Sequence, residues 1–382
     1  MSLESFRRHT PELLIAAFGL IFLAAVSGTV GGEAGSFLVA SLDVAFFVVL
    51  AMLVYLADDR HPAYRWAAVF WLLALVGGVA AAAAGVGVIA ILPAEVLEGA
   101  EFDPETVDLA LAGEVALLLL GVLAAALASL VGLSRRFRVR LARYLPFDPD
   151  SLLHTVALVV ILALILIPTI PLLATGGPPF LSPQFLDPLL ESGDLLADTV
   201  TLNAYTLFWT IVASFFIAGA CVRKTPKKAL ERLGLVRPRG REVGFAIVAA
   251  LALVAAFHFI DPALAGLIGL LGLPVTDAEA VNLLFLGTLT IPGIIMASVA
   301  AGFGEEVSIR GLLQPRFGII LPALLFASLH AFQYSWDGLI SVFLAGIAFA
   351  YIRRYSNTTT SAITHTIYDL VLFAALMVGI AI

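Results

Sequence analysis

The sequence predicts an all-α membrane protein, a polytopic transmembrane helical bundle of about eleven spans with a cytoplasmic N-terminus. Of its 382 residues, 61% are hydrophobic and only 13% are charged. The mean hydropathy of +1.05 lies far above the usual balance of soluble domains. The chain also contains eleven apolar runs of the length that a helix needs to cross about 30 Å of hydrocarbon.

The eleven apolar runs follow one another with short polar connections. The expected spans cover residues 12–31, 37–57, 64–91, 109–133, 152–175, 201–222, 243–270, 283–304, 318–335, 338–353 and 360–380. The first run follows Arg7 and Arg8, as the apolar part of a signal peptide would. Its length and the lack of a small-residue cleavage site favour a retained span.

The distribution of positive charge predicts the orientation of the bundle. With the N-terminus in the cytoplasm, all 21 Lys and Arg fall in cytoplasmic segments, in agreement with the positive-inside rule. The charged residues of the outer connections, such as residues 93–108, are acidic. We therefore expect a multi-pass integral protein of the cell membrane. The net charge of -7 says little about partners, because the two signs lie on opposite sides.

Residues 223–242 are expected to divide the chain into two membrane modules. This segment is basic and contains Pro226 and Pro238, a composition typical of a linker. It separates an N-terminal six-span region of unknown role, residues 1–222, from a second module, residues 243–382. No internal repeat relates the two modules, which argues against an inverted-repeat transporter.

The segment GFGEEVSIRGLLQPRFG, residues 302–318, places charge at the cytoplasmic end of the eighth span. A charged side chain at mid-membrane costs roughly 2.5 to 3.5 kcal/mol, so such residues usually serve a function. On a helix, Glu306 and Arg310 are four residues apart in the order that favours an ion pair. Glu305 points about 100° away from Glu306 and is expected to remain a free carboxylate, the kind of group that acts as a general base.

Two later helices add histidines to this constellation. His330 ends FASLH, with Phe326 one turn earlier on the same face, and could orient a water beside Glu305. His365 and Asp369 in HTIYD are four residues apart and project to one side of their helix. One buried histidine alone usually indicates a satisfied core residue, but the three elements together indicate a site.

These patterns, Glu-Glu-x-x-x-Arg, Phe-x-x-x-His and His-x-x-x-Asp in this order on apolar helices, resemble the CAAX-processing and bacteriocin-processing (CPBP or ABI) family of intramembrane proteases. The resemblance implies a CPBP-like protease core at residues 243–382. It also implies that Glu305 and His330 activate the attacking water, while His365 and Asp369 form the oxyanion-stabilising side.

The resemblance further implies a supporting role for three residues, with Glu306 and Arg310 holding the site together beside Phe326. The eukaryotic CAAX endopeptidases of the family carry Asn where this chain has Asp369, whereas many prokaryotic members accept Asp. An ionised Asp cannot donate a hydrogen bond to a developing oxyanion, so the change weakens that role for Asp369.

Metal use stays open at the level of sequence. Glu305, His330 and His365 could supply three zinc ligands with water as the fourth, while the family is also described as a metal-free glutamate protease. The H-E-x-x-H pattern of many zinc proteases is absent. We favour a mechanism that requires no cofactor.

The sequence thus predicts a hydrolase, an intramembrane endopeptidase that cleaves a membrane-associated protein or peptide at the cytoplasmic side. Its expected partners are membrane lipids and this substrate, with no nucleic acid. The alternative is a non-catalytic membrane scaffold, sensor or bacteriocin-immunity-type protein. Glu305 lies near the cytoplasmic edge and the two histidines lie deeper, so we expect either a helix that continues to about residue 313 or a cavity open to the cytoplasm.

Overall fold

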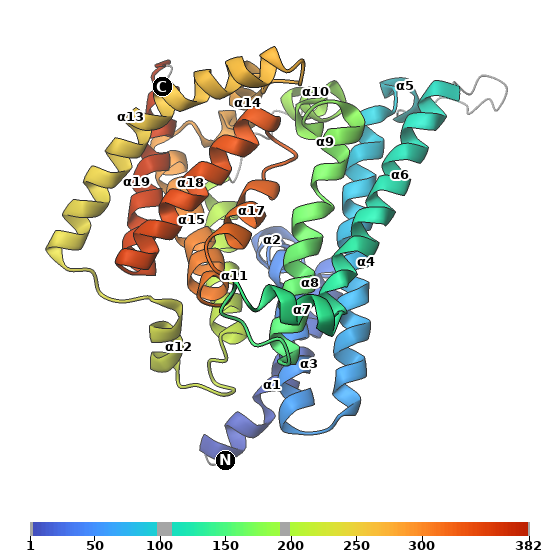
Figure 1. Cartoon of the computed structure of the whole chain (residues 1–382), viewed down its shortest axis with the longest axis vertical. Helices are drawn as coiled ribbons and strands as arrows, with labels where there is room; N and C mark the ends of the chain where they lie inside the picture. The colour runs from blue at the N-terminus through green and yellow to red at the C-terminus, as the bar shows by residue number, and fades with distance from the viewer. Residues whose placement is uncertain (1–2, 98–108, 192–198, 381–382) are drawn as a thin grey trace.

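The computed structural model describes residues 3–97, 109–191 and 199–380, and the regular structure in these ranges is helical (Figure 1). Helices account for 81% of the described residues, which contain no strand. The predicted all-α class is confirmed.

The first half of the chain forms a set of long helices joined by short ones. Their bounds are α1 Leu3–Ser27, α2 Gly32–Val39, α3 Leu42–Asp59, α4 Ala63–Ile91, α5 Ala94–Leu97, α6 Leu109–Ser129, η2 Leu130–Leu133, α7 Arg135–Leu141, α8 Leu152–Leu166, α9 Thr169–Thr175, η3 Pro179–Leu181, α10 Pro183–Glu191 and α11 Thr199–Ile217. Apolar side chains of α3, α4, α6 and α8 form one buried core in this half.

The second half contains the helices that carry the predicted site. Their bounds are α12 Pro226–Leu233, α13 Gly240–Leu270, α14 Ala278–Leu284, η5 Leu286–Thr288, α15 Ile291–Glu305, η6 Glu306–Leu313, α16 Gln314–Phe317, α17 Ile320–Ser328, α18 Trp336–Tyr355 and α19 Thr358–Met377. In this half α15 packs against α19, and α13 packs against both α18 and α19.

Eight described helices are long and apolar enough to cross a membrane, and the bent pair α2 and α3 makes a ninth if it is one span. These helices overlap nine of the eleven expected runs. The other two runs, residues 283–304 and 318–335, are divided among shorter elements, with 15 residues in α15 and nine in α17.

The polar connections gather at two ends of the molecule (Figure 1). The short helices α5, α10 and α14 lie at the upper end in this view, whereas α12 and the α3–α4 connection lie toward the lower end. Two of these short helices, α5 and α10, lie in connections that the sequence places on the outer side. The rest of these connections, residues 98–108 and 192–198, lies outside the described residues.

The two halves of the chain pack against each other. Helix α11 contacts α15, and α8 contacts α17. At the second contact the Ser328 hydroxyl donates to the Leu164 carbonyl over 2.8 Å. Within the second half, a Cβ on Gly302 would lie 2.6 Å from the backbone nitrogen of Thr366. Glycine at this position therefore allows α15 and α19 to approach closely, which sets the distance between the two sides of the site.

Candidate active site

The helix that carries both glutamates does not stop at Glu305. It continues from α15 into a π-helix, η6, and then into α16. The expected continuation of the helix to about residue 313 is confirmed. Stretches of π-helix are rare and often mark functional sites. Here the change of helix type falls between Glu305, the last residue of α15, and Glu306, the first residue of η6.

Glu306 lies at the centre of a buried polar cluster and contacts three of its side chains. Its side chain is fully buried, and its Oε1 lies 3.1 Å from Nη1 of Arg310. This is the ion pair that the sequence predicts. The same oxygen lies 3.3 Å from Nδ1 of His365, and Oε2 accepts a 2.6 Å hydrogen bond from the Ser361 hydroxyl. Both oxygens of this carboxylate are thus engaged within the protein.

Arg310 fixes η6 against α18. Its Nη1 approaches Glu306 as an ion pair without hydrogen-bond geometry. Its Nη2 donates to the Gly346 carbonyl over 3.3 Å. One turn later, Nε2 of Gln314 donates to the Ala350 carbonyl over 2.9 Å. Two buried side chains on η6 and α16 therefore bond carbonyls that are themselves four residues apart on α18.

Aromatic rings enclose the charged groups. The Arg310 guanidinium lies 4.2 Å from the centroid of the Phe326 ring. The His365 ring stacks on Phe349, with centroids 4.3 Å apart, and meets the edge of Phe326 at 5.9 Å. Cations are attracted to aromatic faces, and these rings also exclude water from the buried side of the cluster. Phe326, which the resemblance predicts as a supporting residue, thus contacts both Arg310 and His365.

His365 brings the carboxylates together. Its Nδ1 faces Glu306, while its Nε2 lies 3.4 Å from Oδ2 of Asp369 and 4.0 Å from Oε2 of Glu305. Asp369 is one turn later on α19, so the predicted pair shares one face of that helix. One imidazole therefore contacts three carboxylates from two helices.

Glu305 is the accessible member of the cluster. Its side chain is 35% exposed, compared with 16% for Asp369 and 5% for His365. The Glu305 carboxylate makes no hydrogen bond with the described part of the chain, and the nearest group of opposite potential charge is Nε2 of His365. The two adjacent glutamates thus have opposite environments, because Glu306 is buried and paired with Arg310 while Glu305 is partly exposed to solvent.

His330 stands apart from the carboxylates. It lies in the turn after α17, and its Nδ1 is 2.8 Å from the Phe326 carbonyl oxygen. Its ring contacts Phe326 at 5.2 Å and stacks with Tyr334 at 6.1 Å. Within the described residues, no hydrogen bond or ion pair joins His330 to Glu305. Phe326 is the shared neighbour, since its ring contacts both His330 and His365.

Two site residues were missed by the motif argument. Ser361, which donates to Glu306, precedes His365 by four residues, so the spacing that paired His365 with Asp369 could have identified it. Tyr334 is also part of the site, because its ring stacks with that of His330, with centroids 6.1 Å apart. No sequence pattern identified Tyr334, because its position depends on the turn between α17 and α18.

The zinc alternative does not fit this arrangement. In the ranges that the structure describes, no group of three or more His, Cys, Asp or Glu side chains is placed to hold a metal ion. A zinc site of Glu305, His330 and His365 would require His330 at the carboxylates, but its ring lies against Phe326 and Tyr334. We therefore derive no step through a metal.

Comparisons with known proteins agree with the predicted resemblance. Residues 287–371 match the family model described as type II CAAX prenyl endopeptidase Rce1-like. The uncharacterized protein YpbD of Bacillus subtilis (strain 168) is 32% identical over 82 residues, a match that covers 22% of this chain and 43% of YpbD. No solved structure matches the chain significantly. The resemblance to the CPBP proteases is thus confirmed for an Rce1-like domain at residues 287–371, carried by a protein with multiple apolar helices.

Proposed function

We propose that this chain is an intramembrane endopeptidase that hydrolyses a peptide bond of a membrane-associated protein or peptide at the cytoplasmic side. The observation that carries this proposal is the contrast between adjacent glutamates. Glu306 is fully buried and paired, whereas Glu305 is 35% exposed and lies 4.0 Å from His365. A free carboxylate beside an imidazole can accept a proton from water, as a general base must.

The proposed reaction uses Glu305 and His330 to hold and activate one water. Glu305 takes a proton as the water oxygen attacks the carbonyl carbon of the substrate. The same proton then passes to the amide nitrogen as the carbon–nitrogen bond breaks, which leaves a carboxylic acid and an amine. At neutral pH the acid gives up its proton and the amine takes one, so the products are a carboxylate and an ammonium group. His330 has no direct contact with Glu305 in the described structure, so the water between them would join the two residues.

The oxyanion side is assigned to His365 and Asp369. Each ring nitrogen of His365 faces a carboxylate, so we propose that both carry a proton in the resting site. Nε2–H would then turn from Asp369 to the developing oxyanion. Asp369 acts as the acceptor that orients the ring, and Glu306 holds the other nitrogen. In this arrangement Asp369, which replaces the Asn of the eukaryotic members, does not need to donate a hydrogen bond to the oxyanion.

The proposed membrane arrangement keeps eleven spans in the cell membrane, with the N-terminus in the cytoplasm. In it, residues 1–222 form an added membrane region and residues 243–382 form the protease core. The basic segment 223–242 does more than connect them, because it includes α12, which docks on η6. Arg232 on this helix donates to the carbonyls of Gly311 and Leu312 over 3.1 and 3.2 Å.

The test is cleavage of a vesicle-anchored reporter peptide, with and without a prenylated cysteine, by the full chain. Glu305→Gln should lower the rate by about 10²- to 10⁴-fold, the usual contribution of a general base. His330→Ala should lower it in the same direction, and a chelator should leave the wild-type rate unchanged. The matched control is Glu279→Gln, which removes an exposed carboxylate outside the cluster.

Thermal unfolding of the same variants separates catalysis from folding. Unchanged cleavage by a folded Glu305→Gln variant would remove the proposal. A complete lack of proteolysis in the wild type, together with loss of stability in the variants, would support the scaffold alternative instead.

A further inference from the structure

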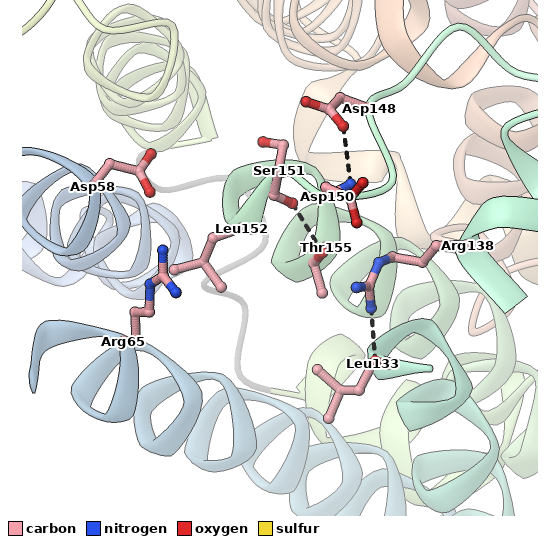
Figure 2. A pocket seen from close by; sticks show the side chains of 9 residues that line it. All are labelled: Asp58, Arg65, Leu133, Arg138, Asp148, Asp150, Ser151, Leu152 and Thr155. Carbon is pink, nitrogen blue, oxygen red and sulfur yellow. Dashed lines mark hydrogen bonds between the residues drawn. The ribbon is translucent and has the colours of Figure 1, made fainter. Parts of the chain in front are cut away.

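Two cavities lie one above the other along helix α4 and the segment formed by α6 and η2. The first, the polar cavity, has a volume of about 440 Å³ and includes Arg65 and Leu133 in its lining (Figure 2). The second, the apolar groove, has a volume of about 370 Å³ and includes Leu73 and Leu130. Leu133, which lines the polar cavity, and Leu130, which lines the apolar groove, both belong to η2. The polar cavity therefore lies directly beyond one end of the apolar groove.

A buried arginine lines the polar cavity without a carboxylate partner. Arg138 is only 9% exposed. Its Nε donates to the Pro149 carbonyl over 2.7 Å, and its Nη1 donates to the carbonyls of Gly132 and Leu133 over 3.0 and 2.6 Å. Its Nη2 makes no hydrogen bond with the described residues. Figure 2 shows the guanidinium turned inward, toward Thr155.

Two acids of the polar cavity pair with arginines that lie outside it. Asp58 accepts from Arg223 over 3.2 Å, and Asp150 accepts from Arg135 over 2.8 Å. Neither of these arginines lines the cavity. Asp150 is thus matched by Arg135, whereas Asp58 shares the charge of Arg223 with Asp59, whose carboxylate lies 2.8 Å from the same guanidinium.

Two arginines that line the polar cavity have no ion pair within the described residues. Arg65 and Arg138 remain against Asp148, which accepts the backbone N–H of Asp150 but has no ion pair in the described structure. The Arg65 side chain makes no hydrogen bond or ion pair with the described residues, and Figure 2 shows it directed toward the start of α8. The N-terminus of α8, capped by Ser151, adds a positive helix-dipole end. These groups together suit an anion such as a phosphate.

The apolar groove has the size of one lipid chain in one leaflet. Its lining on α4 extends from Leu73 to Ala84, which is about 16 Å at the rise of an α-helix. One leaflet contributes about half of the roughly 30 Å hydrocarbon core. Midway along the groove, Gly77 leaves open space, because a Cβ there would have no atom within 4 Å.

We propose that this pair of cavities binds one anionic phospholipid of the surrounding membrane. Its phosphate lies in the polar cavity beside Arg65 and Nη2 of Arg138, and one acyl chain lies in the apolar groove between α4 and α6. The site belongs to the N-terminal region, outside the Rce1-like domain, and does not depend on the proposed protease activity.

The chain part of the proposal is tested by filling the groove. The purified full chain is mixed with phosphatidylglycerol or phosphatidylcholine, and bound lipid is counted by native mass spectrometry. Gly77→Leu should lower phosphatidylglycerol retention about tenfold, the effect of roughly 1.4 kcal/mol. The matched control is Gly78→Leu, because Gly78 has equal space but does not line the groove. Equal retention by the two variants would overturn the proposal.

The headgroup part is tested by charge removal. Arg65→Gln should abolish the preference for phosphatidylglycerol over phosphatidylcholine, whereas Arg143→Gln, which removes an exposed arginine outside both cavities, should keep it. Inorganic phosphate separates the two sources of the anion. A site that binds phosphate alone as tightly as the lipid, and that ignores Gly77→Leu, would be a free-anion site and would overturn the lipid assignment.

Discussion

The protein buries two arginines in opposite ways. Arg310, in the second half, is 1% exposed, and its charge faces the carboxylate of Glu306 at 3.1 Å. Arg138, in the first half, is 9% exposed, and its described partners are backbone carbonyls. The first arginine is neutralised inside the protein, whereas the second keeps a net charge and a free donor. The comparison indicates that a buried arginine supports internal structure in one region and an external anion in the other.

The location of each arginine explains the difference. Arg310 and Glu306 lie one helical turn apart and are enclosed by α18 and α19, where a charge without a partner would be costly. Arg138 lies on the short helix α7 and lines a cavity, where water or a ligand can reach it. A charged side chain enclosed by packed helices requires a partner of opposite charge, whereas one that faces a cavity can be solvated or bind a ligand.

The largest expected effect comes from removing each arginine in turn. Arg310→Met leaves Glu306 buried and unpaired, so it should lower the free energy of unfolding by about 3–5 kcal/mol. Arg138→Met removes hydrogen bonds but leaves no buried charge, so it should cost about 1–3 kcal/mol. Denaturant unfolding of the detergent-solubilised protein measures both values.

A double variant checks the cause of the first effect. Glu306→Gln combined with Arg310→Met should recover part of the lost stability, since no unpaired charge remains. If the double variant is as unstable as Arg310→Met, or if the two single arginine variants lose equal stability, the contrast between the two arginines is wrong.

A smaller effect is expected at Asp369, where the site departs from the eukaryotic motif. Asp369→Ala should lower the cleavage rate about 10²-fold, because His365 loses the acceptor at Nε2. Asp369→Asn keeps an oxygen acceptor and should retain most of the rate. The measurement is cleavage of the reporter peptide, and an Asn variant as slow as the Ala variant would show that the negative charge itself is required.

The smallest effect is expected for the exposed pair beside the polar cavity. The hydrogen bond from Arg135 lowers the pKa of Asp150 below its ordinary value of 3.8. Because the folded pKa is the lower one, this stabilisation is present at neutral pH and is lost as the pH falls through the folded pKa. Arg135→Gln should lower the thermal unfolding midpoint only slightly at pH 7, since exposed pairs contribute little, and not at all at lower pH than that pKa.

The same variant also tests the lipid site. Without Arg135, the charge of Asp150 opposes an anion in the cavity, so phosphatidylglycerol retention should fall a few-fold. Two outcomes would contradict the charges assigned to the cavity. One is a loss of thermal stability in Arg135→Gln that grows as the pH falls, and the other is unchanged retention of phosphatidylglycerol.

Much of the site follows from spacing along single helices. The pairs Glu306 with Arg310 and His365 with Asp369 are four residues apart, and the structure places both pairs together. The π-helix was not predictable in this way, because its hydrogen-bond pattern depends on neighbouring helices rather than on local propensity. The lack of a direct bond between His330 and the carboxylates was not predictable for a related reason, since it depends on the turn that follows α17.

The polar cavity was not foreseen, because its residues come from separate connections. Arg65 and Arg138 were counted only as markers of a cytoplasmic face, and the sequence does not show that one is buried. Long-range packing of α4, η2 and α8 creates that burial. The apolar runs predicted most helices but not the division of two expected runs into shorter elements.

The two bonds from Arg310 and Gln314 to Gly346 and Ala350 restrict how the helices can slide. The two donors are four residues apart, and so are the two acceptor carbonyls. A shift of α18 by one turn, about 5.4 Å, would therefore bring one donor to the carbonyl that the other donor now uses. Any smaller shift would leave both buried donors without acceptors. Relative motion of α18 and η6 should therefore occur in discrete steps of one turn, like a ratchet.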